Sequence, residues 1–279
     1  MTPPRLYTVA DALAPQPPRQ WVVDGILPVN STSLWFGAPG SKKTYGLMDL
    51  AVCVAIGKPW LGYNVTQGAV LLVDEESGPL RLLRRMGECV RGHLGDDSLP
   101  IFATSLHGFN FWAPNVGASA TDLQNTILQT QARLVVIDAL ADVMIGGDEN
   151  TVKDTQKVFH ALRNISEATG AAISLIHHAN KNGGYRGSSA ILGALDLAVD
   201  VESKQGESLV NFATVKARDS EPCKWAAECH WTPTEFWMTG AQAAGSAPRR
   251  IYAKSERYVL EYLIRIPGAT LQDLIDDGM

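Results

Sequence analysis

The sequence predicts an α/β protein with a mostly parallel central sheet that is covered by helices on both faces. Short apolar segments alternate with amphipathic helical segments from about residue 31 to residue 179. The segments VLLV, LVVI and ISLI are apolar at every position, which is typical of strands buried on both faces of a parallel sheet. From about Ala190 the helical spacing gives way to consecutive strand-like segments, and these predict antiparallel strands added at the C-terminal side.

The expected elements follow a strand-then-helix order. Strands are expected at 31–37, 69–77, 101–105, 133–140 and 171–179, and helices at 42–57, 79–94, 121–132 and 151–170. In the first helix, Leu47, Leu50 and Val54 share one face. Three more strands are expected at 195–202, 208–216 and 224–231, and we expect all three to run antiparallel.

The local composition divides the chain into four predicted segments. Residues 1–30 are rich in proline and predict an N-terminal arm, and residues 31–239 carry the α/β core. Residues 240–254 have the small and polar composition of a linker. Residues 255–279 predict two short helices around a Pro-Gly turn, which look like the beginning of a winged-helix module.

Charge and hydropathy exclude some classes of protein. The net charge of −5 argues against a surface coated in basic residues for wrapping duplex DNA, although it allows a local basic channel. There is no uninterrupted apolar run of about 18 residues and no signal-peptide pattern, so we expect a cytoplasmic protein with no membrane partner.

The four cysteines, Cys53, Cys89, Cys223 and Cys229, form no CxxC pair and predict reduced thiols. A metal site at Cys223, Cys229 and His230 is disfavoured, because a structural zinc takes four ligands and no fourth is visible.

The stretch FGAPGSKKTYG has most of a phosphate-binding loop. Such a loop needs backbone N–H groups at a helix N-terminus, a lysine that reaches the β- and γ-phosphates, and a hydroxyl for Mg²⁺. Gly37 and Gly40 supply the glycines of this pattern. Lys43 and Thr44 supply the ammonium and the hydroxyl, so the stretch predicts a site for ATP and Mg²⁺.

Lys42 departs from the pattern, because it stands where a glycine allows the backbone to approach phosphate closely. A lysine here must direct its side chain away from the ligand, which it can do if its φ is negative. The predicted nucleotide-binding residues are Gly37, Ala38, Pro39, Gly40, Ser41, Lys42, Lys43, Thr44 and Tyr45.

Carboxylates end two of the predicted strands. Asp138 ends the apolar strand in RLVVIDAL, where it can hold the water shell of Mg²⁺ beside Thr44. Asp74, Glu75 and Glu76 end the strand in AVLLVDEES. Because ligands gather at the carboxyl ends of strands in α/β sheets, one of these three is the candidate base that activates water.

Six motifs in order, GAPGSKKT, LLVDEES, RLVVIDAL, SLIHHANK, RGSSAI and VKARD, resemble the RecA-type motor domains of ring ATPases. The resemblance covers roughly residues 21–231. It is closest to the plasmid RepA-type hexameric replicative helicases, which are AAA-type P-loop ATPases, and more distant to the DnaB-type helicases. The resemblance implies a RecA-like core that acts as a hexameric ring on single-stranded DNA, with a primase or a loader as a candidate partner.

The resemblance also implies roles for individual residues. Glu76 becomes the water-activating glutamate, with Glu75 as its rival. His178, ahead of His177, becomes the sensor of the γ-phosphate. The K-x-R pair reaches into the ATP site of the neighbouring subunit and consists of Lys216 and Arg218. The loop that faces DNA provides Lys181, Arg186, Gly187, Ser188 and Ser189.

Two other functions stay open at this point. A RecA- or RadA-like recombination ATPase shares the core motifs. A slowly hydrolysing ATP-binding regulatory or assembly protein is favoured by Lys42 and by the modest charge of the predicted DNA loop.

Overall fold

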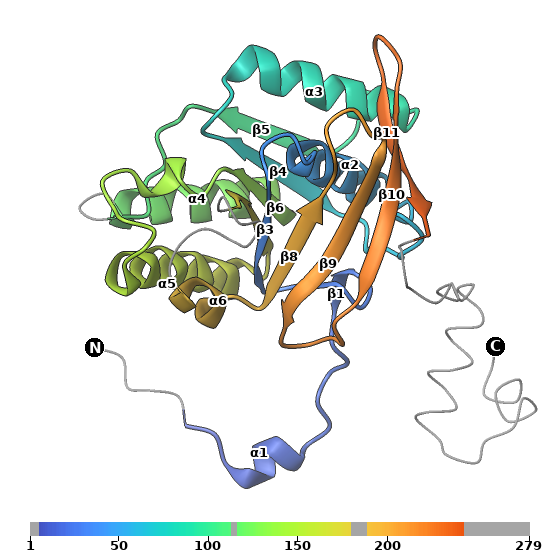
Figure 1. The fold of residues 1–279 in the computed structure, drawn as a ribbon. Coiled ribbons are helices and arrows are strands. Elements are labelled where there is room, and N and C mark those ends of the chain that lie inside the picture. Colours follow the sequence, from blue (N-terminus) through green and yellow to red (C-terminus); the bar gives the residue numbers. More distant parts are fainter. Residues whose placement is uncertain (1–5, 113–115, 180–188, 243–279) are drawn as a thin grey trace, which may run out of the picture. The chain divides into compact units, whose positions relative to one another are not determined.

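The computed structural model describes residues 6–112, 116–179 and 189–242 (Figure 1). The strands are β1 (Trp21–Val23), β2 (Leu27–Pro28), β3 (Thr32–Gly37), β4 (Ala69–Asp74), β5 (Ile101–Ser105), β6 (Ala132–Asp138), β7 (Ala172–His178), β8 (Leu197–Glu202), β9 (Leu209–Ala217), β10 (Lys224–Trp231) and β11 (Phe236–Ala241). The helices are α1 (Val9–Leu13), α2 (Lys43–Ile56), α3 (Pro79–Gly92), α4 (Val116–Thr130), the 3-10 helix η1 (Asp142–Met144), α5 (Val152–Thr169) and α6 (Ser189–Ala194).

Nine of the strands form one sheet in the order β11-β10-β9-β8-β3-β7-β6-β4-β5. The pairs from β8 to β5 are all parallel, and the pairs among β8, β9, β10 and β11 are antiparallel. The predicted α/β class with a mostly parallel sheet is therefore confirmed. The prediction that the whole C-terminal group is antiparallel is wrong for β8, because the crossover through α6 returns the chain beside β3 in the same direction.

Helices cover both faces of the sheet (Figure 1). Along β4, Val70 and Leu72 belong to the core cluster that includes α2, whereas Leu71 and Val73 belong to the cluster that includes α4 and α5. This alternation is the period-two pattern of a strand that is buried on both faces. Helix α2 is buried along most of its length, which fixes the phosphate loop at its N-terminus to the sheet.

Both ends of the core extend beyond the predicted limits. β1 and β2 pair with each other, and Val22, Val23, Ile26 and Leu27 are fully buried, so the predicted arm at 1–30 ends near residue 20. Strand β11 was not predicted, and it takes Gly240 and Ala241 from the predicted linker. In both places a short apolar run pairs with a neighbouring strand and buries one face, which outweighs a local composition typical of an arm or a linker.

The rest of the predicted linker and the predicted helical segment at 255–279 lie outside the described residues. Within the described ranges, no helix combines the length and the apolar character that crossing a membrane requires.

Candidate nucleotide site

The loop between β3 and α2 lies at the carboxyl end of the sheet. Strand β3 ends at Gly37 and α2 begins at Lys43. Gly40 has a φ of +80°, and the Ser41 N–H donates to the Ala38 carbonyl at 3.1 Å, which closes the turn. The first backbone N–H groups of a helix have no carbonyl partner within it, so the start of α2 offers donors to an anion.

Lys42 adopts the left-handed conformation, with φ 67° and ψ 22°, so the negative φ considered from the sequence does not occur. The loop keeps the backbone conformation that glycine adopts readily, at a cost to lysine of about 1–2 kcal/mol. The Lys42 ammonium donates to Ser203 Oγ at 2.5 Å and to the Glu207 carbonyl at 2.6 Å, both in the β8–β9 turn. These bonds offset the backbone cost and hold the ammonium at that turn.

The ammonium of Lys43 lies inside the loop. It donates to the carbonyls of Gly37 and Ala38, each at 2.9 Å, and only 7% of the residue is exposed. Burial lowers the pKa of Lys43, and the Asp138 and Glu76 carboxylates oppose that shift. Phosphate oxygens are charged acceptors, so they would bind this ammonium more strongly than the two carbonyls do.

Thr44 and Asp138 meet as the strand-end pattern predicted, although 94 residues separate them. The Thr44 hydroxyl donates to Asp138 Oδ2 at 2.8 Å. Asp138 Oδ1 is buried and has no hydrogen-bond partner among the described residues. Burial raises the pKa of Asp138 to about 6, the Thr44 bond opposes the shift, and Glu76 and Asp74 add to it. A carboxylate oxygen without a partner beside a hydroxyl is a donor set that suits Mg²⁺ and its water shell.

The three acidic residues after β4 have different surroundings. Asp74 accepts the Ser77 N–H at 2.9 Å and the Ser105 hydroxyl at 3.0 Å, so it holds the turn. Glu75 accepts the backbone N–H groups of Gly108 and Phe109 at 3.0 to 3.2 Å.

Glu76 is exposed and lines the pocket at the phosphate loop. These contacts favour Glu76 over its two neighbours as the group available to a water molecule.

The two histidines at the end of β7 lie on opposite faces of the sheet. His177 is buried and its Nε2 lies 3.8 Å from a Glu149 carboxylate oxygen. His178 lines the same pocket as Glu76. His178 is therefore the histidine that can contact a ligand in this pocket.

The pocket at the loop has a volume of about 380 Å³. Its lining includes the predicted residues Lys43, Thr44, Glu76, Asp138 and His178. Five further lining residues were not predicted from the sequence, and they are Ser77, Arg81, Arg85, Ile176 and Trp231.

The spacing of the two arginines in the sequence could have predicted their position. Arg81 and Arg85 are four residues apart on α3, so they share the helix face that follows the Glu76 turn. Arg85 donates to Ser77 Oγ at 3.2 Å and lies over the Tyr45 ring at 5.7 Å. Trp231 comes from the end of β10, and its ring packs edge-on against Tyr45 at 6.0 Å. No local sequence pattern could have predicted that Trp231, which is far from the phosphate loop in sequence, lines this pocket.

The predicted K-x-R pair lies elsewhere in the described chain. The Lys216 ammonium donates to the Leu192 carbonyl, and Arg218 donates to the Gly193 carbonyl at 2.6 Å and to Asp196 at 3.3 Å. Both cations thus bind the C-terminal end of α6, and neither lines the pocket of its own subunit.

Most of the predicted DNA loop lies outside the described residues, including Lys181, Arg186, Gly187 and Ser188. Ser189 is described only as the first residue of α6.

A strand, a phosphate loop and a buried helix with a Lys-Thr start, facing a strand-end aspartate, define a P-loop nucleoside triphosphatase. Comparison with protein families agrees, because the model of the AAA domain matches residues 2–184. The chain therefore belongs to the AAA domain family, a family of P-loop ATPases. A search of curated proteins found no significant match.

We predict that Lys42→Ala will destabilise the protein more than Lys42→Gly, by about 1 kcal/mol, because only glycine adopts a positive φ without cost. Both variants lose the bonds to the β8–β9 turn, so their difference isolates the backbone contribution. Urea unfolding at neutral pH measures both free energies. Equal stability of the two variants would contradict a left-handed residue 42.

Asp138 should make stability depend on pH in the absence of Mg²⁺ and nucleotide. Its pKa of about 6 lies above the ordinary value for aspartate, so the fold favours the protonated form. The free energy of unfolding should therefore fall as the pH rises from about 4 to about 6, by up to about 3 kcal/mol for a shift of two units.

Asp138→Asn cannot ionise but keeps an acceptor for Thr44, so it serves as the matched variant. Because only the wild type loses stability as Asp138 ionises, the free energy of unfolding of Asp138→Asn minus that of the wild type should increase from pH 4 to pH 6. Denaturant unfolding at pH 4, 5, 6 and 7 measures the difference, and a difference that does not change with pH would refute the assignment.

Proposed function

We propose that this protein is a ring-forming motor that hydrolyses ATP and moves along single-stranded DNA, as a helicase in the replication of a plasmid, phage or other mobile element. The observation that carries the proposal is the convergence of Lys43, Thr44, Asp138, Glu76 and His178 on one pocket at the start of α2.

The donor set fits ATP with Mg²⁺. Thr44 and the free oxygen of Asp138 would hold the ion, which supplies charge neutralisation at the phosphate oxygens. Lys43 would exchange its two carbonyl partners for phosphate oxygens. Glu76 would orient the attacking water and take its proton, and His178 would contact the γ-phosphate.

The position of Arg218 supports a multi-subunit site. Its side chain is 43% exposed and binds the end of α6, and it does not line the pocket of its own chain. Arg218 could therefore stabilise the charge of phosphoryl transfer only in the ATP site of a neighbouring subunit. The exposed position of Arg218 outside its own pocket favours a ring in which Lys216 and Arg218 act in trans.

A basic groove on the surface supports the proposal that the motor binds and moves along nucleic acid. The groove, of about 950 Å³, is lined along α5 by Lys153, Lys157, His160 and Arg163, and by the end of α6. No acidic side chain lines it among the described residues. In a chain of net charge −5, this local excess of cations suits a phosphate backbone.

The test is steady-state ATP hydrolysis with and without a long single-stranded oligonucleotide, together with the mass of the assembly in the same buffer. We expect DNA to stimulate turnover at least tenfold in the wild type. Lys43→Ala should lose hydrolysis because it loses the phosphate ligand, and Arg218→Ala should lose the stimulated rate while it retains ATP binding.

Lys58→Ala serves as the control, because it removes an exposed cation beyond the end of α2. ATP binding with slow turnover that DNA does not change would contradict the motor and would favour the regulatory or assembly protein. A filament in place of a ring-sized mass would favour a recombination ATPase.

A further inference from the structure

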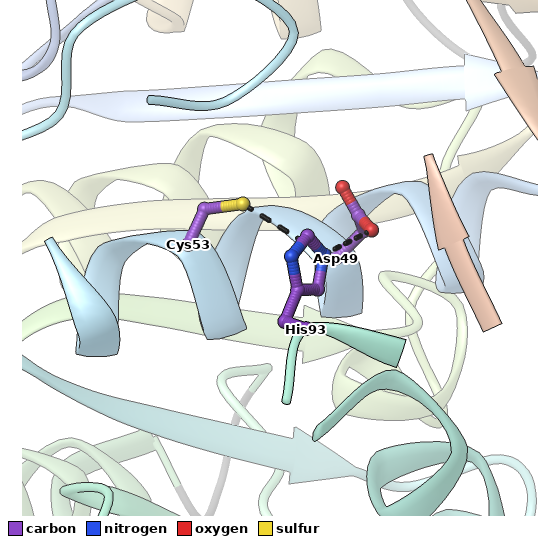
Figure 2. A group of neighbouring side chains, drawn as sticks. All are labelled: Asp49, Cys53 and His93. Atoms are coloured by element: carbon purple, nitrogen blue, oxygen red, sulfur yellow. Dashed lines mark hydrogen bonds and ion pairs between the residues drawn. The ribbon is translucent and has the colours of Figure 1, made fainter. Parts of the chain in front are cut away.

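A second cluster of chemically active side chains lies inside the protein, away from the phosphates. Asp49 and Cys53 are four residues apart on α2, and His93 follows α3 (Figure 2). One ligand atom from each residue lies within 4.8 Å of the others, and all three residues are buried. The group differs from the cysteine–histidine set considered from the sequence, in which Cys229 and His230 are successive residues of β10 and so point to opposite faces.

The ring nitrogen His93 Nε2 faces both other residues (Figure 2). It lies 2.7 Å from Asp49 Oδ1 and 3.9 Å from Cys53 Sγ. In a tetrahedral zinc site, with bonds of about 2.0 Å to N and O and about 2.3 Å to S, these pairs are separated by about 3.3 and 3.6 Å. The two measured separations differ from those of a zinc site by about 0.6 and 0.3 Å, so small side-chain movements would bring these two pairs to coordination geometry.

Unsatisfied polar atoms provide a second, independent observation. Asp49 is fully buried, and its Oδ2 has no hydrogen-bond partner in the described part of the chain. A buried carboxylate oxygen without a partner costs free energy, and a bound cation removes that cost. Oδ1, the oxygen that contacts His93, also accepts the Met238 N–H at 2.9 Å, and this bond holds the carboxylate in place beside the cluster.

The surrounding backbone holds the three residues in place. The end of α3 lies so close to β11 that a Cβ at Gly92 would meet the Phe236 carbonyl oxygen at 2.1 Å. Asp49 and Cys53 lie on the buried helix α2, which hydrogen bonds to β11 through Met238. Ligands on packed elements need little reorganisation to bind an ion.

We propose that Asp49, Cys53 and His93 bind a divalent transition metal, with zinc as the expected ion. The donors are one oxygen, one sulfur and one nitrogen, a mixed set that suits zinc rather than Mg²⁺ or Ca²⁺. A carboxylate and a thiolate together neutralise the two charges of the ion, so the buried site carries no net charge. The thiol of Cys89, one turn before His93, lies outside this group of ligand atoms, so a water molecule would complete the coordination shell.

The metal would join α2 to the end of α3. Helix α2 begins at the phosphate loop, and α3 carries Arg81 and Arg85 into the pocket. The ion would thus fasten two elements of the nucleotide site at a distance from the phosphates. The inference does not rest on the proposed motor function.

The test uses the full chain, unfolded and then refolded with zinc, with cobalt(II), or with a chelator. After desalting, elemental analysis should find about one zinc per chain. The cobalt form should show a thiolate-to-cobalt charge-transfer band, and the zinc form should unfold at a higher temperature than the chelated form.

Cys53→Ser and His93→Gln should each weaken metal binding roughly tenfold or more and should abolish the stabilisation by zinc. The amide of Gln can donate a hydrogen bond to Asp49 in place of the imidazole. If His93 had a purely structural role, His93→Gln would therefore change metal binding and the stabilisation by zinc very little. Cys223→Ser is the matched control, because Cys223 lies outside the cluster and is only half-buried.

A wild type that retains no zinc and shows no cobalt band would overturn the proposal, as would a cobalt band that Cys53→Ser leaves unchanged. If a variant does not refold, the wild type refolded with cobalt and with chelator still decides the question.

Discussion

The backbone conformation of the phosphate loop is the constraint on which the site depends. A loop that wraps an anion at the start of a helix needs residues of positive φ, and here both Gly40 and Lys42 have it. The lysine adopts this conformation at a cost, and its ammonium bonds to the β8–β9 turn. The unusual residue therefore joins the loop to the neighbouring strands and does not alter the loop's conformation.

The order of the strands assembles the rest of the site. Strand β7 lies between β3 and β6, and β4 lies beyond β6, so the carboxyl ends of these four parallel strands meet at one edge. Lys43, Asp138 and Glu76 come from three separate βα units and reach one pocket for this reason. Burial then sets the chemistry of the site, because it lowers the pKa of Lys43 and raises the pKa of Asp138.

The sequence was sufficient for the features that follow from local periodicity and from strand-end rules. It predicted the parallel strands, the loop and the pairing of Thr44 with Asp138, because each depends on a short pattern. It did not predict the positive φ of Lys42, because the bonds that offset its cost come from a turn more than 160 residues away. Trp231 and the contact of His93 with Asp49 were equally out of reach, since the packing of distant elements brings these residues together.

Equilibrium binding of a non-hydrolysable ATP analogue with Mg²⁺ to the wild type, Lys42→Gly and Lys43→Ala tests most directly whether this loop is a working nucleotide site. We expect the wild type and Lys42→Gly to bind the analogue within about threefold of each other, because the backbone conformation is the same in both. Lys43→Ala should bind at least tenfold more weakly, because it lacks the charged phosphate ligand. Much tighter binding by Lys42→Gly than by the wild type would mean that Lys42 obstructs the site, and it would contradict the account.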